Sequence, residues 1–402
     1  ESLPLARRTP QPALVRRSLG LLAAFTALPL ACAGSGSSST TGAEASGSVS
    51  ARPRTERRAE PTPQVDRPAL PEAPADRYEV ADGQLAFPSP DGFLLEGNLY
   101  YPRGATPAGA VVLVAGSGPQ SRRGAVPGQL GMAFGFEFPV LEELAVALAR
   151  RGYAVLSYDK RSCGRFNACG DNHYPEPTEA VTVQQFLMDA VAAVDALAKQ
   201  PMVQKSRMVV LGHSQGATLV PHVLQSRGRL RAGVMVAAPH SSVDDLFDVQ
   251  ARQIRDVLRA VGGPPGVAKQ LTQLGSQVRA LRDDEAQEGP VAGAPSAFWR
   301  SWLELGDGAP RVAARLRRPL LVLHGGLDWN VPRAEHAAWR ETLARVPTAR
   351  VVLVPEVTHA LNRVTSDRIR DIQPGDLGRE IAPEVMDALH RFLALAMPNE
   401  PA

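Results

Sequence analysis

Ser214 is the residue of this chain whose neighbours best suit nucleophilic chemistry. It lies in a G-H-S-Q-G motif, residues 212–216, between an apolar run typical of a strand and a pattern typical of a helix. A G-x-S-x-G nucleophile elbow requires this strand–turn–helix setting, because the tight turn lifts the serine hydroxyl above the sheet. A serine hydroxyl is a weak nucleophile at neutral pH and needs a base within hydrogen-bond reach. The motif therefore predicts a base elsewhere in the chain.

Asp328 and His359 supply an acid and a base in a recognisable order. Each follows a strand-like apolar run, residues 320–324 and 351–354, so each is expected at the carboxyl end of its own strand. The order serine, acid, histidine differs from the orders of chymotrypsin and subtilisin. Glu356 is the nearest rival acid, but it precedes His359 on the same loop. We therefore favour Asp328.

The chemistry assigns a role to each of these residues. His359 takes the proton of Ser214 during attack and returns it to the leaving group, while Asp328 fixes the imidazole tautomer. The negative oxygen of the tetrahedral intermediate needs two preset donors. We expect one from the N–H of Gln215 and the other from Ser117, in the glycine-rich stretch after the first central strand. A phosphate-binding loop at that stretch is disfavoured, because no Gly-Lys-Ser/Thr follows it.

Apolar runs alternate with helical patterns along residues 78–402. Runs without polar alternation are typical of strands buried on both faces of a parallel sheet. They cover residues 111–115, 154–158, 208–212, 234–237, 320–324 and 351–354, and two earlier strands, 84–87 and 93–101, flank an Asp-Gly hairpin signal. We therefore predict a doubly wound α/β fold, with a mostly parallel sheet of about eight strands and helices on both faces.

Residues 241–310 interrupt this alternation, because they contain no strand pattern. Two amphipathic stripes, residues 243–261 and 267–281, predict helices separated by a Gly-Gly-Pro-Pro turn. We interpret the segment as an inserted helical cap; the alternative is that both stripes are ordinary core-facing helices. In a cap, Trp299 and Trp302 would wall an apolar acyl pocket.

Residues 1–31 have the pattern of an export signal. Arginines precede the apolar run 19–31, which ends in small residues and is shorter than the ~18 apolar residues needed to span a membrane. Cleavage before Cys32 would leave a lipid-modified N-terminus in the cell envelope, whereas cleavage after Ala33 would give a secreted or periplasmic protein. We favour the lipoprotein, attached to the membrane through Cys32, because a Ser-rich segment follows.

Composition separates a linker from the folded part of the chain. With 44% hydrophobic and 21% charged residues, the whole chain is neither an integral membrane protein nor wholly disordered. Residues 32–77 contain too few large apolar side chains to form a core, so they predict a disordered linker before one folded domain, residues 78–402. The formal charge of +3 comes from residues 1–31, and a formally neutral remainder disfavours a nucleic-acid partner.

Cys163 and Cys169 are the two cysteines of the predicted folded domain. In an exported protein, a pair this close in sequence suits a small loop disulfide, whereas in the cytosol the same pair would more often be free thiols. A metal site that includes Asp171 and His173 is the alternative, but no second ligand pair with zinc-like spacing follows. We therefore predict a disulfide, no metal and no cofactor.

Together, these segments resemble the α/β-hydrolase superfamily and, within it, the bacterial serine esterases and prolyl-oligopeptidase-like hydrolases related to dienelactone hydrolase. The resemblance covers about residues 83–398 and rests on Gly116-Ser117-Gly118-Pro119, Tyr158-Asp159-Lys160-Arg161, the G-H-S-Q-G motif, Gly326-Leu327-Asp328, Val331-Pro332 and Thr358-His359. It implies a two-step acyl transfer on a small-molecule ester. Ser214, Asp328 and His359 would form the triad, and Gln215 and Ser117 the oxyanion hole.

Two departures from the family pattern concern the mouth of the site. Ala115 stands where many relatives have His, and Ser162 where they usually have Gly, so substrate preference does not transfer directly. The alternatives to an exported serine esterase are a serine peptidase or thioesterase on the same triad, and a non-catalytic cell-surface binding module. A binding module needs no triad, and prolyl oligopeptidases usually carry a propeller where this chain has a disordered-looking tail. We therefore expect ester hydrolysis.

Overall fold

The computed structural model describes residues 76–124, 138–163, 181–261, 266–283, 289–363 and 380–398. The predicted export signal, Cys32 and nearly all of the predicted linker lie outside these residues, so those three assignments stay predictions. Within the described ranges, every helix is too short or too polar to cross a bilayer.

Eight strands of the described residues form one sheet in the order β1-β2-β4-β3-β5-β6-β7-β8. Their bounds are β1 Val80–Pro88, β2 Leu94–Pro102, β3 Gly109–Val114, β4 Tyr153–Tyr158, β5 Met208–His213, β6 Leu230–Val236, β7 Leu320–Gly325 and β8 Ala349–Val354. Strand β2 runs antiparallel to β1 and to β4, and every other neighbouring pair is parallel. The predicted mostly parallel α/β sheet is confirmed.

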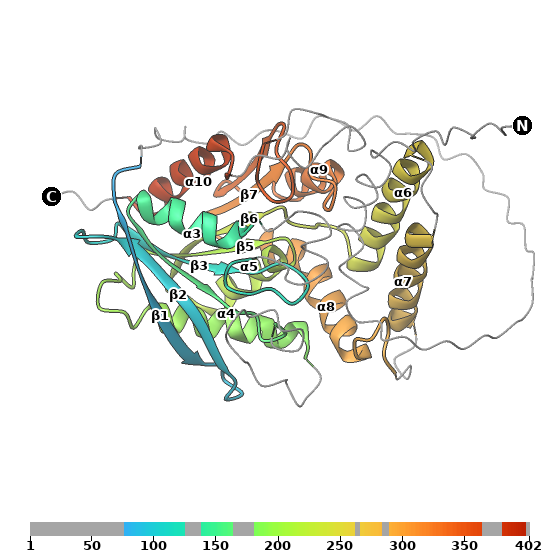
Figure 1. Ribbon diagram of the computed structural model, residues 1–402, viewed down its shortest axis with the longest axis horizontal. Helices are drawn as coiled ribbons and strands as arrows, with labels where there is room; N and C mark the ends of the chain where they lie inside the picture. The colour runs from blue at the N-terminus through green and yellow to red at the C-terminus, as the bar shows by residue number, and fades with distance from the viewer. Residues whose placement is uncertain are drawn as a thin grey trace, which may run out of the picture.

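Helices cover both faces of the sheet, which explains why its central strands are apolar without alternation (Figure 1). The helices outside the insertion are α3 Val140–Arg150, α4 Val183–Leu197, α5 Gln215–Ser226, α9 Arg333–Thr342 and α10 Pro383–Ala396. Helices α3 and α10 share one apolar core with alternate strand residues such as Val209 and Leu211. Helices α4, α5 and α9 share the other with Met208 and Val210. Both faces of β5 are therefore buried.

Strand β6 begins four residues before its predicted start. The prediction placed it at residues 234–237, whereas the strand runs over Leu230–Val236. Arg231 points to solvent near its beginning and interrupts the apolar run on which the prediction relied. A polar residue at the end of a buried strand does not end its hydrogen-bond ladder.

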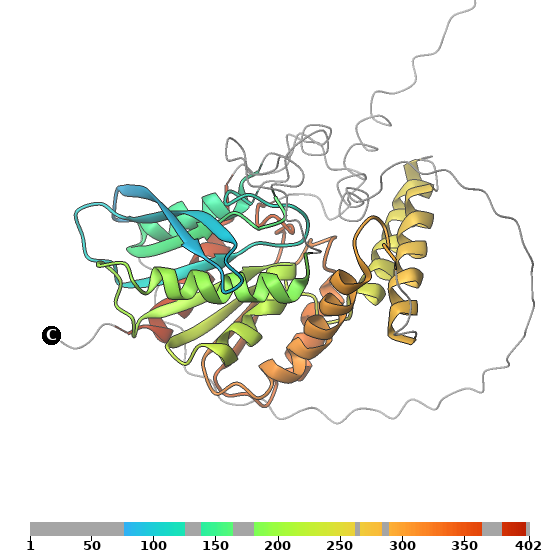
Figure 2. The ribbon, with the colours of Figure 1, turned by 90° about the horizontal axis from the view of Figure 1, so that it is seen from below.

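Three helices lie between β6 and β7: α6 Val243–Val261, α7 Gly266–Asp283 and α8 Ser296–Ala313. Figures 1 and 2 both show α6 and α7 side by side beyond one end of the sheet, with α8 leading back to it. These helices have an apolar cluster of their own, which includes Phe247, Val278 and Trp299. The segment thus has a separate small core. That it caps the site remains a prediction.

Helix α8 was not predicted as a helix from the sequence. Gly306, Gly308 and Pro310 are poor helix formers and obscure the apolar spacing. The helix nevertheless continues beyond residue 310 to Ala313, because Ala309 and Ala313 are buried in the core that α4 and α5 share. Tertiary packing therefore outweighs weak propensity, and α8 joins the inserted helices to the sheet.

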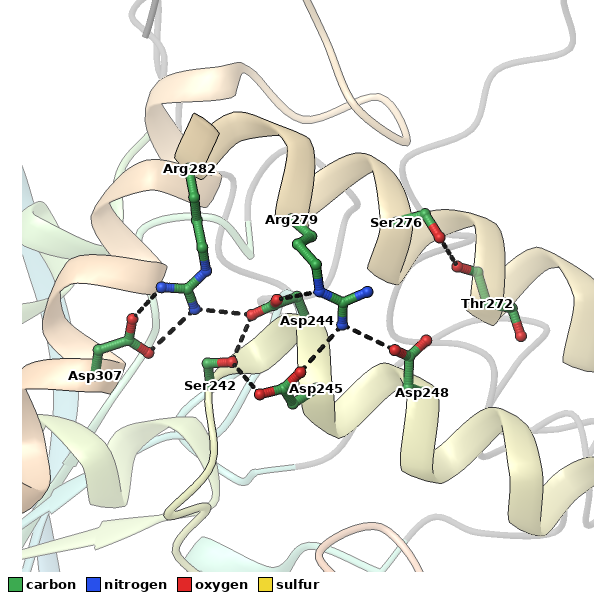
Figure 3. A network of polar contacts seen from close by, with 9 residues as sticks. All are labelled: Ser242, Asp244, Asp245, Asp248, Thr272, Ser276, Arg279, Arg282 and Asp307. Atoms are coloured by element: carbon green, nitrogen blue, oxygen red, sulfur yellow. Dashed lines mark hydrogen bonds and ion pairs between the residues drawn. The ribbon is translucent and has the colours of Figure 1, made fainter. Parts of the chain in front are cut away.

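A network of charged side chains also connects α6, α7 and α8 (Figure 3). Arg279 of α7 bonds to three aspartates at the start of α6, namely Asp244, Asp245 and Asp248. Arg282 bonds to Asp244 and to Asp307 of α8. The three helices are therefore held by ion pairs as well as by their apolar cluster.

Candidate active site

Ser214 occupies a sharp turn between β5 and α5. Its φ of 56° lies in the left-handed region, which is strained for a residue with a side chain. The glycines of the motif permit this turn: a Cβ on Gly212 would lie 2.2 Å from the carbonyl oxygen of Gly216, and one on Gly216 2.3 Å from that of Val114. The motif therefore has the strand–turn–helix geometry of a nucleophile elbow.

Asp328 and His359 meet at the carboxyl ends of β7 and β8. His359 Nδ1 lies 2.8 Å from Asp328 Oδ2, and Asp328 Oδ1 accepts the N–H groups of Asn330 and Val331 at 2.9 and 2.8 Å. Burial by itself raises the pKa of Asp328, but His359 and these donors outweigh burial, so the pKa is lowered. The carboxylate is therefore ionised, accepts the Nδ1–H and leaves Nε2 of His359 free to act as a base.

The rival acid Glu356 does not reach the histidine ring. Its carboxylate accepts a 2.8 Å bond from Arg363, and its side chain is exposed. Nδ1 of His359 is already bonded to Asp328. The structure thus brings Asp328, and not Glu356, to His359.

His213 ties the base to the nucleophile turn. Its Nε2 lies 2.8 Å from the carbonyl oxygen of His359, and the two imidazole rings are 4.7 Å apart. Because a carbonyl only accepts, His213 Nε2 carries the hydrogen. Burial lowers the pKa of His213 to about 4, so this donor stays neutral. Ser214 Oγ makes no hydrogen bond to His359 among the described residues, and catalytic hydrogen bonds often tighten only when substrate binds.

Two backbone N–H groups are available beside Ser214. Among the described residues, neither the N–H of Gln215 nor that of Ser117 has a hydrogen-bond acceptor. The loop after β3 touches the nucleophile, since a Cβ on Gly116 would lie 3.2 Å from Ser214 Cβ. Gln120 braces this loop by accepting the Gly116 N–H and donating to the Ser117 carbonyl. The structure therefore brings both predicted donors to the elbow.

Trp299 and Trp302 stack in parallel inside the inserted helices, with ring centroids 5.7 Å apart. Trp299 is buried and donates its Nε1–H to the carbonyl oxygen of Val291 at 2.9 Å. Neither ring lines the cavity of about 10 Å³ beside Gln215. Their role as walls of an acyl pocket stays a prediction. Trp329, the neighbour of Asp328, packs against the same cluster.

Cys163 is buried and disulfide-bonded. Its predicted partner Cys169 lies outside the described residues, as do Asp171 and His173, so this pairing stays a prediction. Within the described ranges, no three histidine, cysteine, aspartate or glutamate side chains are grouped so as to hold a metal ion.

Sequence reasoning missed the supporting roles of His213 and Lys160. His213 was treated only as a member of the motif turn, and Lys160 only as part of a family-like motif. Lys160 Nζ donates to the Gly116 carbonyl at 2.6 Å and to Gln215 Oε1 at 2.8 Å. These partners are far apart in sequence, so no local pattern indicates the contacts.

The sheet, the elbow and the Asp328–His359 pair define this protein as an α/β-hydrolase. Residues 136–363 match the family model described as "Serine aminopeptidase, S33", which is more than half of the chain. The chain therefore belongs to this family of α/β hydrolases.

Several proteins similar to this chain are named as esterases. Esterase EstD of Thermotoga maritima is 24% identical over 295 residues, which are 72% of this chain and 64% of EstD. Est1E of Butyrivibrio proteoclasticus is 15% identical with a TM-score of 0.49, over 79% of this chain and all of Est1E. Esterase Pf2001 of Pyrococcus furiosus is 18% identical with a TM-score of 0.47, over 83% of this chain and 98% of its own.

Proposed function

We propose that this protein is an exported serine esterase that cleaves carboxylic esters through an acyl-enzyme on Ser214. The observation that carries this proposal is the buried, ionised Asp328 on Nδ1 of His359, next to a strained serine elbow. The two unpaired N–H groups beside Ser214 supply what an oxyanion requires. The name of the relative EstD supports ester hydrolysis as well.

The two halves of the reaction use the same groups. His359 Nε2 takes the hydroxyl proton while Ser214 Oγ bonds to the carbonyl carbon of the ester, and the N–H groups of Ser117 and Gln215 bind the resulting oxyanion. The C–O bond then breaks, His359 returns its proton to the leaving alcohol, and an acyl-enzyme remains. A water molecule, deprotonated by His359, attacks the acyl-enzyme. The carboxylic acid leaves and Ser214 is protonated again.

The family description makes a serine peptidase the second candidate. An aminopeptidase must bind the ammonium group of its substrate, for which a free carboxylate is the usual partner. Asp244 and Asp245 at the start of α6 are already paired with Arg279. The carboxylate of buried Glu335 is also occupied, because it accepts the backbone N–H groups of His240 and Ser241. These occupied carboxylates favour an ester over a peptide.

Export and lipid attachment are the remaining parts of the proposal. The signal-like residues 1–31 and the Ser-rich segment that follows support a cell-envelope lipoprotein anchored through Cys32. Mass analysis of the mature protein from membranes tests this part separately. A diacylglyceryl mass on Cys32 supports it, and an N-terminus at Gly34 replaces it with a secreted or periplasmic protein.

Labelling with a fluorophosphonate and hydrolysis of nitrophenyl esters and dipeptide anilides test the reaction. We expect labelling at Ser214, faster cleavage of esters than of anilides, and a loss of several powers of ten in Ser214→Ala. Ser226→Ala, at the end of the same helix, is the matched control and should retain activity. Undiminished labelling of Ser214→Ala would refute the nucleophile, and faster anilide cleavage would replace the esterase with a peptidase. No turnover and no labelling of the wild type would favour a binding module.

A further inference from the structure

Lys160 is a buried cation directly behind the proposed oxyanion site. It follows β4, and its Nζ donates to the Gly116 carbonyl at 2.6 Å and to Gln215 Oε1 at 2.8 Å. The ring of Phe186 lies 4.2 Å from the same nitrogen. The Lys160 backbone is fixed too, since its N–H donates to the Gln120 carbonyl at 3.0 Å. The ammonium therefore joins the loop after β3 to the residue after the nucleophile.

No carboxylate in the described part of the chain bonds to this ammonium. Asp189 lines the same small cavity, but both of its oxygens accept hydrogen bonds from Arg161. No ion pair of the described residues includes Lys160. Burying a cation against neutral acceptors costs free energy. If Lys160 only filled space, an apolar side chain of the same length would therefore give a more stable protein. Burial lowers the pKa of Lys160 to about 7, although the charge of Asp189 favours the protonated form.

Lys160 donates to two oxygens, one in the peptide group of the Ser117 N–H and the other in the side chain of Gln215. Ser117 and Gln215 are the two residues predicted to supply the oxyanion donors. The Gly116 carbonyl and the Ser117 N–H are parts of one peptide group, and all peptides of the described residues are trans. In a planar trans peptide the C=O and N–H point in opposite directions, so a bond that fixes the carbonyl also fixes the N–H. Gln120 bonds to the neighbouring peptide groups, through the Gly116 N–H and the Ser117 carbonyl, whereas Lys160 bonds to this one. Lys160 therefore sets the direction in which the Ser117 N–H points.

Gln215 is joined to Lys160 through its side chain and not through its backbone N–H. Its Oε1 accepts from Lys160, while its buried Nε2 has no partner among the described residues. The ammonium is thus what orients this side chain. The backbone N–H of Gln215 is the second oxyanion donor.

We propose that Lys160 is a positioning residue, whose ammonium holds the Gly116–Ser117 peptide so that the Ser117 N–H faces the oxyanion, and ties this peptide to the side chain of Gln215 beside the second donor. The inference rests on the proposed function. It assigns Lys160 no contact with substrate and no part in proton transfer. Its effect should therefore appear in the transition state and not in substrate binding.

Lys160→Met tests this role, because methionine keeps an unbranched side chain and removes the ammonium. We expect kcat for a nitrophenyl ester to fall about 10²-fold, as after loss of one oxyanion-hole donor, with KM changed by less than about threefold. The exposed Lys199→Met is the matched control and should keep both values. A raised KM at unchanged kcat would contradict the proposal.

A trifluoromethyl ketone separates positioning from a merely structural role. Ser214 Oγ adds to its carbonyl carbon and turns the carbonyl oxygen into a stable oxyanion, so the inhibition constant reports on the oxyanion site. In Lys160→Met this constant should rise by the factor by which kcat/KM falls. If the variant only contains less folded enzyme, kcat falls while the inhibition constant of the active fraction stays at the wild-type value, which overturns the proposal.

A second variant decides the matter if Lys160→Met does not fold. Gln215→Met keeps Lys160 and the backbone N–H of residue 215 but removes one of the two bonds. We expect kcat to fall by about tenfold with a parallel rise of the ketone inhibition constant. If the wild type is active and Lys160→Met keeps kcat within about twofold, the positioning role alone is overturned. If Lys160→Met does not fold, the same result in Gln215→Met overturns it. A wild type that neither hydrolyses esters nor reacts with a fluorophosphonate overturns the proposed function instead.

Discussion

Arginine–aspartate pairs occur both at the sheet beside the active site and among the inserted helices, and the pair in which both side chains are almost fully buried is at the sheet. Side chains of Arg161 and Asp189 are 3% and 2% exposed. Those of Arg279 and Asp245, between α6 and α7, are 39% and 64% exposed (Figure 3). Solvent screening makes an exposed pair worth little, whereas removing one partner of a buried pair leaves an uncompensated charge. The same kind of ion pair therefore contributes differently to stability in the two regions.

This difference shows where the molecule is made rigid. Arg122 follows the oxyanion loop and pairs with buried Asp159 through its backbone N–H and its guanidinium. The same guanidinium bonds to Asn98 of β2. The loop is thus fixed from one side by Arg122 and from the other by Lys160, both of which are buried. The inserted helices are held by a small core and by ion pairs whose arginines are partly exposed, so they can be adjusted at lower cost.

The largest expected effect is on the triad itself, in the rigid region. Asp328→Asn should lower kcat by about four powers of ten, because the amide no longer accepts from Nδ1 and favours the wrong tautomer of His359. Circular dichroism should show a folded protein. Glu356→Gln, on the same loop as His359 but exposed, is the matched control and should stay near wild-type activity. If Glu356→Gln is the more damaging change, the acid has been misassigned.

The two classes of ion pair can be compared directly by unfolding in urea. Asp189→Asn should lower the free energy of unfolding by about 3 kcal/mol, because Arg161 stays buried and, among the described residues, the partly exposed Asp91 is the carboxylate it keeps. Asp245→Asn, which breaks an exposed pair with Arg279, should cost less than about 1 kcal/mol and still less in high salt. Equal losses in the two variants would contradict the comparison.

Much of the sheet could be predicted from the sequence, because local composition determines it. Six of the eight strands carry apolar runs and a hairpin signal marks the other two, while the order of Ser214, Asp328 and His359 follows from motifs next to strand ends. Contacts between distant segments cannot be predicted from local composition in this way. Lys160 lies 55 positions from Gln215, and His213 lies 146 positions from His359. Only the folded sheet brings these supporting residues together.

The disulfide at Cys163, with Cys169 as its predicted partner, makes the rigid region stiffer still. Pairing with Cys169 closes a small loop after β4, directly beyond Lys160, and should add about 2 to 3 kcal/mol at most. Intact mass before and after reduction should differ by two hydrogens, and Cys163→Ser should unfold at lower urea. Two freely alkylated thiols in non-reduced periplasmic material would contradict the pairing, and bound zinc would revive the metal alternative.

The smallest expected effect is a difference between the two regions in how stability depends on pH. Residues 241–313 contain no histidine, whereas α10 carries buried His390 against the ring of Tyr153. Burial, together with the charge of Arg151, lowers the pKa of His390 to about 4. Between pH 6.5 and 4 the unfolded histidine binds a proton that the folded one does not, so stability falls as the pH falls through this window.

His390→Phe keeps an aromatic ring in place and removes the titrating group. The buried Nδ1 of His390 has no partner among the described residues, so phenylalanine breaks no hydrogen bond at that atom. We expect the loss of unfolding free energy between pH 7.5 and pH 5 to be smaller than in the wild type, by about 2 kcal/mol. Urea midpoints at the two pH values measure it, with ester hydrolysis at pH 7.5 as the control. An identical loss in both proteins would show that His390 titrates alike in the folded and unfolded states, and that the acid sensitivity of the sheet region comes from other groups such as His213.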